Sequence, residues 1–152
     1  MDRIDTKILS ILQREGQISM ARLSERVGLS LSACHRRVKN LESDGKISHY
    51  AARLNRRAVG LEFQVFIEIK LESQRKENIR TFEAAIREMD EVLECHLISG
   101  EFDYLIRVAA RSTEDYEKLY RDRLSELPSV TQMKTLLSLS TVKEFQGFYL
   151  GR

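Results

Sequence analysis

Residues 30–46 gather polar side chains that are suited to binding a nucleic acid. Arg36, Arg37 and Lys39 supply cations, while His35 and Asn40 supply hydrogen-bonding groups at neighbouring positions. Arginine can donate two parallel hydrogen bonds to guanine, and Ser or His can donate to purine acceptors or to phosphate. We therefore expect this stretch to contact double-stranded DNA. The predicted DNA-binding residues are Ser30, Ser32, Ala33, His35, Arg36, Arg37, Lys39, Asn40 and Lys46.

Two kinds of contact are expected within this set. The base edges are assigned to Ser32, Ala33, His35 and Arg36, and the phosphates to Arg37, Lys39 and Lys46. An alternative stays open, because many surface helices carry several cations and contact only water. One of Arg36 and Arg37 can also pair with a glutamate of its own domain.

The other reactive side chains form no catalytic or metal-binding pattern. Cys34 and Cys95 are the only cysteines, and no closely spaced set of Cys and His offers zinc ligands. Glu94, Cys95 and His96 are consecutive in a predicted strand, where neighbouring side chains point to opposite faces, so they cannot converge. We expect no metal, no cofactor and no enzymatic activity.

Two short helices and a glycine turn are expected to position the DNA-binding residues. Apolar residues recur at helical spacing up to Val27, and Gly28 suits the left-handed position after a helix end. Ser30 can cap the next helix, which Asp44 and Gly45 end. Two helices joined by a short turn, with cations carried outward on the second, form a helix-turn-helix. Its expected buried residues are Leu31, Cys34 (or Ala33), Val38 and Leu41.

A further helix and a short strand pair complete the predicted N-terminal domain. Asp2 can cap a first helix that extends through Gln13, and Gly16 breaks it. After Gly45, a strand pair would form a wing that lies over phosphates. We therefore predict a winged helix-turn-helix domain over residues 1–53 and a hinge over residues 54–60.

From Leu61 onward the apolar residues alternate with polar ones, as in a strand with one buried face. A helix, two strands, a second helix and a β-rich segment follow. The expected ranges are 61–71, 79–89, 92–99, 104–110, 112–128 and 130–143. This βαββαβ order is that of a ferredoxin-like fold. The fold class is therefore α+β, with residues 61–152 forming the second domain.

The net charge changes sign near the predicted hinge. Residues 1–60 contain twelve Lys and Arg against six Asp and Glu, whereas residues 61–152 contain thirteen against seventeen. The basic part suits a polyanion, so the acidic part should have another role. Its sheet should carry both helices on one face and leave the other face bare. Phe66 interrupts that outer face, and we expect a second copy to cover it in a homodimer.

This organisation resembles the Lrp/AsnC family of transcriptional regulators over essentially the whole chain. The similarity lies in Asp2-x-x-Asp5-x-x-Ile8-Leu9, in LSERVGLS from Leu23 to Ser30, in Arg36-Arg37-Val38, and in Gly100-Glu101-Phe102-Asp103-Tyr104. The resemblance implies a DNA-binding domain joined by a hinge to a ligand-sensing domain called RAM. It also implies dimers that assemble into tetramers, octamers or larger rings. Amino acid effectors would bind between dimers, near the glycine-to-aspartate turn.

The effector site implied by this resemblance combines that turn with the last strand. Turn amides near Gly100 can receive a carboxylate, and Asp103 can accept from an ammonium group or hold the turn shut. Met133 stands where the family often has a small polar residue, which favours an apolar or sulfur-tolerant pocket. The expected residues are Gly100, Glu101, Phe102, Asp103, Tyr104, Gln132, Met133, Thr135 and Leu136.

The sequence therefore predicts a sequence-specific transcriptional regulator whose assembly or DNA affinity responds to an amino acid. The chain has no run of eighteen apolar residues, so no membrane span is expected, and its start resembles no secretory signal. We expect it in the cytoplasm, associated with the nucleoid. An architectural protein that wraps or bends DNA without an effector fits the helix-turn-helix and the charge distribution equally well.

Overall fold

The chain folds into two units, each with its own apolar core. The computed structural model describes residues 1–151. The second unit runs from Leu54 to Thr141, and the first combines residues 1–53 with the segment from Val142 onward. The predicted bounds, residues 1–53, 54–60 and 61–152, differ from these units in the segment from Val142. The Phe148 backbone in that segment forms two hydrogen bonds, of 2.9 and 2.8 Å, with the Gln13 side chain.

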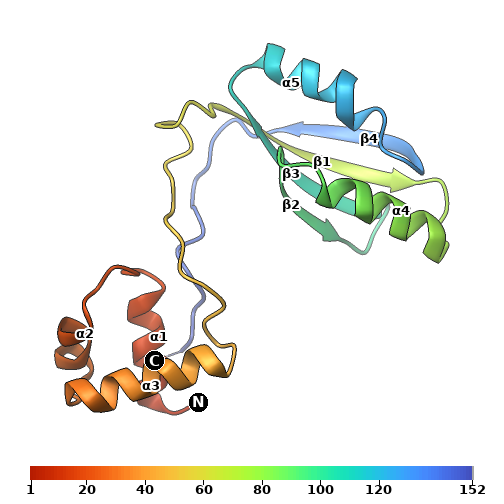
Figure 1. Cartoon of the computed structure of the whole chain (residues 1–152). Coiled ribbons are helices and arrows are strands. Elements are labelled where there is room, and N and C mark those ends of the chain that lie inside the picture. The colour runs from red at the N-terminus through yellow and green to blue at the C-terminus, as the bar shows by residue number, and fades with distance from the viewer. Residues whose placement is uncertain (152) are drawn as a thin grey trace. The chain divides into compact units, whose positions relative to one another are not determined.

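Three capped helices form the first unit: α1 (Arg3–Leu12), α2 (Met20–Val27) and α3 (Leu31–Ser43) (Figure 1). Asp2, Ser19 and Ser30 each accept a hydrogen bond from a backbone amide in the first turn of the helix that follows. Gly28 ends α2 in the left-handed conformation with φ of 74°. The predicted helix-turn-helix is confirmed.

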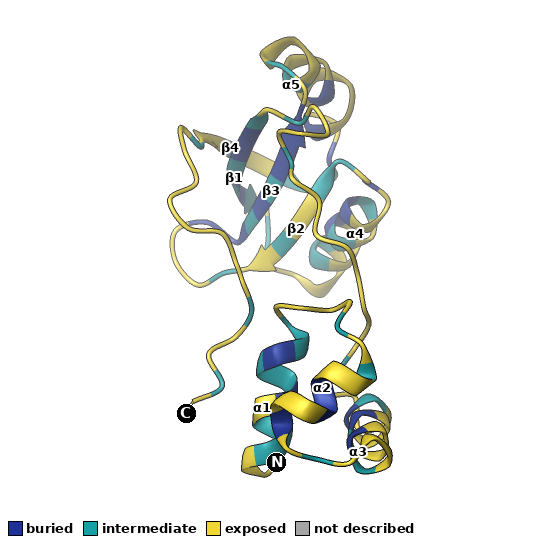
Figure 2. Ribbon diagram, turned by 90° about the vertical axis from the view of Figure 1, so that its left-hand side faces the viewer, coloured by how far each residue is buried: buried dark blue, intermediate teal, exposed yellow. Residues whose placement is uncertain are grey.

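The helical core contains one apolar face from each helix (Figure 2). Ile8, Leu23 and Cys34 are fully buried in it, and Val38 and Leu41 lie beside them. Cys34, rather than Ala33, takes the inward position. The expectation that Leu31 is buried is wrong, because this residue starts α3 beyond the edge of the core and is 55% exposed.

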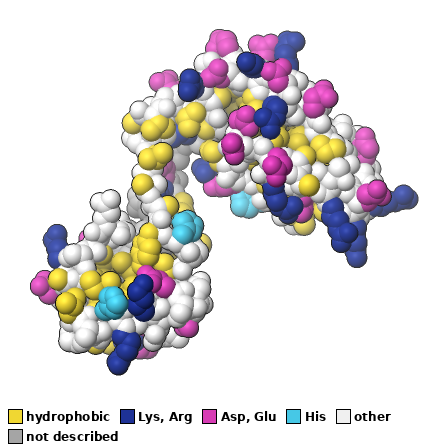
Figure 3. Space-filling view, in the orientation of Figure 1, with side chains coloured by type: hydrophobic (Ala, Val, Ile, Leu, Met, Phe, Trp, Pro, Cys, Tyr) yellow, Lys and Arg dark blue, Asp and Glu magenta, His cyan; other side chains and the backbone are white. Residues whose placement is uncertain are grey.

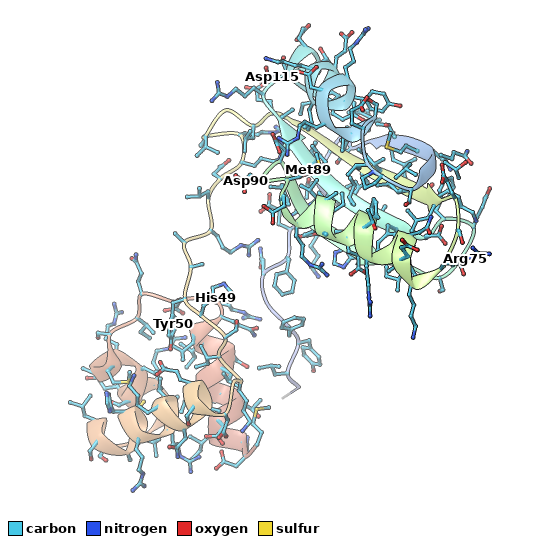
Figure 4. All side chains as sticks on the ribbon, turned by 45° about the vertical axis from the view of Figure 1, so that its right-hand side comes forward. His49, Tyr50, Arg75, Met89, Asp90 and Asp115 are labelled. Carbon is cyan, nitrogen blue, oxygen red and sulfur yellow. The ribbon has the colours of Figure 1, made fainter. Side chains whose placement is uncertain are left out.

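The predicted strand pair of the wing does not form in the described part of the chain between α3 and residue 62. The amides of Lys46 and Ile47 instead both donate to the Leu41 carbonyl and close the end of α3. Farther along, the Tyr50 hydroxyl donates to Glu42 at 3.1 Å, which ties the segment back to α3 (Figure 4). Because the amides of Lys46 and Ile47 donate to α3, they do not pair with a neighbouring strand.

The second unit contains the elements β1 (Phe63–Leu71), α4 (Lys76–Arg87), β2 (Val92–Leu97), β3 (Tyr104–Ala110), α5 (Thr113–Leu119), η1 (Tyr120–Leu124) and β4 (Val130–Leu137). Its four antiparallel strands lie in the order β2-β3-β1-β4. Residues of α4, α5 and η1 pack with alternate residues of β1 and β3 in one core, so the helices cover one face of the sheet (Figures 1 and 2). The ferredoxin-like βαββαβ prediction is confirmed. No helix among residues 1–151 is both long enough and apolar enough to span a bilayer.

The face of the sheet away from the helices is left bare within this unit, as predicted, and carries both apolar and charged residues. Phe66 pairs with Leu136 across β1 and β4, but charged residues surround them. Glu68 lies 3.2 Å from Lys134 of β4, and Arg107 of β3 lies 2.6 Å from Glu94 of β2. We call this surface the open face.

Candidate functional site

The exposed side of α3 carries most of the predicted base-reading residues. Ser32, His35 and Arg36 are exposed, as expected, while Ala33 is half-buried and Ser30 is occupied as the helix cap. Cys34, Val38 and Leu41 hold the opposite side of the helix in the core. The helix therefore presents its polar side, starting at its first turn, in the way that a recognition helix enters a major groove.

Four of the predicted residues border a single polar hollow of about 320 Å³ in the first unit: Arg36, Arg37, Asn40 and Lys46. Asp44 lies on its rim and pairs with Lys46 at 2.6 Å. Arg36 makes no ion pair within residues 1–151, so its guanidinium is available to an incoming phosphate or base. Basic side chains and an amide around one hollow match the chemistry of a nucleic acid backbone.

Arg37 faces its own domain rather than solvent. Its Nη1 lies 2.6 Å from Asp2 and 2.7 Å from Asp5, which connects α3 to the start of α1. The amide of Asp5 and the Arg37 guanidinium hold the pKa of Asp2 below its usual value, and the two carboxylates raise the pKa of Arg37. The alternative of an internal pair thus applies to Arg37, with aspartates in place of the expected glutamate. Its assignment to phosphate is not supported by this geometry, because the domain already neutralises its charge.

Lys39 also has an internal partner, but an exchangeable one. It lies 2.8 Å from Glu42, one turn along α3, and the lysine is exposed. This hydrogen bond and that from Tyr50 lower the pKa of Glu42. Exposed pairs of this kind are worth about 0–1 kcal/mol, so a phosphate can replace the carboxylate at little cost.

The turn before β3 is held closed by the Asp103 carboxylate. Its Oδ2 accepts from the Leu71 amide and its Oδ1 from the Gln74 side chain, both at 2.8 Å. The Asp103 amide in turn donates to the Ile69 carbonyl at 2.9 Å. Two roles were predicted for Asp103: to accept a hydrogen bond from an ammonium group, or to hold the turn shut. The structure shows the second role, because both carboxylate oxygens accept hydrogen bonds from the chain itself.

The exposed part of the same turn borders the open face. Gly100 has φ of 143°, which favours glycine, and both it and Glu101 are exposed, whereas Phe102 is buried. Lys70 donates to the Glu101 carbonyl, and Lys134 lies 5.8 Å above the Phe102 ring. These two lysines were missed from the sequence, because only the strand register brings β1 and β4 beside the turn.

The four candidate residues of β4 do not share a face. Gln132 pairs with Lys70 and Leu136 with Phe66, on the open face. Met133 and Thr135 instead pair with Ile69 and Ile67, which point toward the helices. Thr135 lies 2.8 Å from the Tyr116 hydroxyl, and Met133 packs against the core. The pleat of the strand separates the two pairs, so all four cannot line one pocket on the open face.

Tyr104 belongs to the core rather than to an exposed site. It is buried, its ring centroid lies 4.6 Å from that of Phe82, and its hydroxyl donates to Glu83 of α4 at 2.9 Å. Burial, followed by the Glu83 carboxylate, raises the pKa of Tyr104 from 10.0 to about 12. The same hydrogen bond, with a smaller contribution from Arg87, lowers the pKa of Glu83.

The Tyr104→Phe variant should lose less stability than the wild type at alkaline pH. The folded state keeps the phenol proton to about pH 12, whereas the unfolded chain releases it near pH 10. The contribution of Tyr104 to the free energy of unfolding is therefore fully present below pH 10 and is lost as the pH rises toward 12. Urea unfolding across this window should show a steeper decline for the wild type than for the variant, and parallel declines would contradict the prediction.

Comparison with known protein families places the chain among characterised regulators. Residues 1–48 match a winged helix-turn-helix DNA-binding profile, and residues 64–148 match the Lrp/AsnC ligand binding domain. The chain is 40% identical to the leucine-responsive regulatory protein of Escherichia coli K12 over 95% of its length and 88% of that protein. It is 38% identical to the proline dehydrogenase transcriptional activator of Rhizobium radiobacter, over 95% of this chain and 92% of the relative.

Solved structures give the same result for the fold. A transcriptional regulator of Neisseria meningitidis in complex with L-Met matches with a TM-score of 0.94 and 34% identity, over 99% of this chain and 97% of the other. An AsnC family transcriptional regulator of Agrobacterium tumefaciens matches with a TM-score of 0.93 and 31% identity, with the same coverage. Both domains of the chain are therefore accounted for by these similarities.

Proposed function

The chain belongs to the Lrp/AsnC family of transcriptional regulators, and we propose that it binds operator DNA as a homo-oligomer under the control of an amino acid. The observation that carries the DNA-binding half is the exposed side of α3, where Arg36 is free of internal ion pairs in the described chain and lies beside Asn40 and Lys46. Phosphate contacts would set affinity, and Arg36 with Ser32 and His35 would read bases. We further propose that it acts in the cytoplasm.

The open face supports the proposal of a homodimer. Phe66 and Leu136 lie side by side on it, and one buried polar atom there, Arg107 Nε, has no hydrogen-bond partner in the described chain. Buried polar atoms are nearly always satisfied in a complete assembly, so this atom favours a partner that supplies an acceptor. A carboxylate on the same face of a second copy, related by a twofold axis, can supply it. The operator should then be an imperfect palindrome.

An amino acid is the effector class that best fits the ligand domain. The exposed turn at Gly100 lies next to Lys70, Lys134 and Gln132, which can receive a carboxylate and orient it. Relatives named for leucine response and a neighbour solved with L-Met support the same class. Because the relatives are named as regulators, we propose binding without catalysis and without a cofactor.

Thermal unfolding of the pure protein against all twenty amino acids tests the effector. A ligand that binds only the folded state adds about 2.7 kcal/mol to its stability at a hundred times its dissociation constant, which raises the unfolding temperature. We expect at least one hit, and light scattering should show that the hit changes the molar mass of the assembly. A flat response across the panel would contradict amino acid control and favour an architectural protein that wraps DNA without an effector.

A further inference from the structure

The second unit has a cavity of about 400 Å³ at the end of the sheet opposite to the Gly100 turn. It lies between the last residues of β3, the start of β1 and one side of α5 and η1. Ala109, Ala110 and Leu119 are nearly buried and provide a small apolar floor. β3 extends from Tyr104 beside the turn to Ala110 in the cavity, a distance of about 20 Å at the rise of a strand. The two locations are therefore separate.

The rim of this cavity is charged with both signs. Arg111 and Lys118 contribute cations, while Asp115 and Asp122 contribute carboxylates. None of these four side chains takes part in an ion pair or a side-chain hydrogen bond within residues 1–151. Acidic and basic side chains are interspersed over this unit (Figure 3), and Asp115 projects from the start of α5 (Figure 4). The charged groups at the cavity are thus open to a ligand that carries both charges.

The helix beside the cavity is locally widened. After α5 the chain makes one turn of π-helix, η1, which carries Asp122 and Arg123 onto the side that Asp115 and Leu119 already occupy. Arg123 lies 3.5 Å from Glu91 and 3.4 Å from the Glu88 carbonyl, which closes one wall of the cavity and leaves the other charges unoccupied.

We propose that this cavity is a second binding site for a free amino acid with a small or medium aliphatic side chain. Arg111 and Lys118 bind its carboxylate, Asp115 and Asp122 bind its ammonium group, and the alanine floor accepts the side chain. Equal numbers of cations and carboxylates on the rim favour a zwitterion over an anion or a cation. The inference rests on the proposed control by amino acids and adds a site that can fill independently of the turn.

Calorimetric titration of the full chain with L-leucine and L-methionine tests the second site. We expect two binding events per chain in the wild type. Asp115→Asn combined with Asp122→Asn should weaken one of them at least about tenfold, the effect of losing a charge-assisted hydrogen bond. Arg111→Gln should weaken the same event. Glu126→Gln, which removes an exposed carboxylate outside the cavity, is the matched control and should leave both events unchanged. L-methionine methyl ester, which lacks the carboxylate, should weaken both events, because the proposed site at the turn also binds the carboxylate.

The outcomes separate this proposal from the proposed function. If the double Asp variant leaves every binding event of the wild type unchanged, the second site is overturned and amino acid control stays intact. A single event that the variant abolishes would support the cavity and move the effector away from the turn. No binding to the wild type would overturn both. Unfolding of each variant without ligand checks the fold, and these exposed residues should leave it unaffected.

Discussion

Arg36→Ala is expected to weaken binding to the preferred operator by about 1–3 kcal/mol, or about 5- to 150-fold, and to relax the preference at one base pair. The guanidinium is exposed on α3 and makes no ion pair among residues 1–151, so no internal partner competes with a base for it. Operator sequences selected from a random library provide the preferred site. Titration of that site and of a scrambled site gives both affinities for the wild type and the variant.

The ratio of the two affinities separates base reading from phosphate binding. A base contact lowers affinity for the selected site more than for the scrambled one, whereas a phosphate contact lowers both equally and reduces the salt dependence. Lys46→Ala should behave as the phosphate contact. Arg80→Ala removes an exposed cation from α4 in the other unit and should change neither affinity. An equal loss on both sites for Arg36→Ala would contradict base reading.

Asp103→Ala is expected to lower the free energy of unfolding by about 1.5–3 kcal/mol, the value of hydrogen bonds to a charged group. Asp103 is 6% exposed and Leu71 is 4% exposed, so loss of the carboxylate leaves the Leu71 amide buried without a partner. The Gln74 side chain loses its acceptor as well. Chemical denaturation of the wild type and the variant measures the difference.

A neighbouring residue in the same turn provides the control. Glu101→Ala removes an exposed side chain and should stay within about 0.5 kcal/mol of the wild type. Asp103→Asn keeps an oxygen for the Leu71 amide and should fall between the two. If Asp103→Ala unfolds like the wild type but no longer binds the effector, the carboxylate belongs to the ligand site and its structural role is not the main one.

Local sequence patterns were sufficient for most elements of the fold. Capping residues such as Ser30, the left-handed Gly28 and the alternation along β1 act within a few residues of the chain. The helix-turn-helix and the βαββαβ order therefore followed from them. The wing did not, because a strand forms only with a hydrogen-bonded neighbour, and the backbone after α3 uses its amides to close that helix. The contact between Gln13 and the segment after residue 141 did not follow either, because the two are far apart in the sequence.

The candidate sites depended more strongly on tertiary structure. The side of α3 that faces outward was predictable, since helical period alone separates Arg36 from Cys34 and Val38. That Arg37 is held by Asp2 and Asp5 was not, because helix packing determines which cation meets a carboxylate.

In the second unit, strand register decides that Gln132, and not Met133, lies beside Lys70 on the open face, and a one-residue shift would exchange them. The sequence by itself determined the fold class and the polar side of the recognition helix, because these depend on periodicity and capping. Only the tertiary structure decided which charges are neutralised internally and which remain free to bind, because that depends on distances between elements that the chain order does not contain.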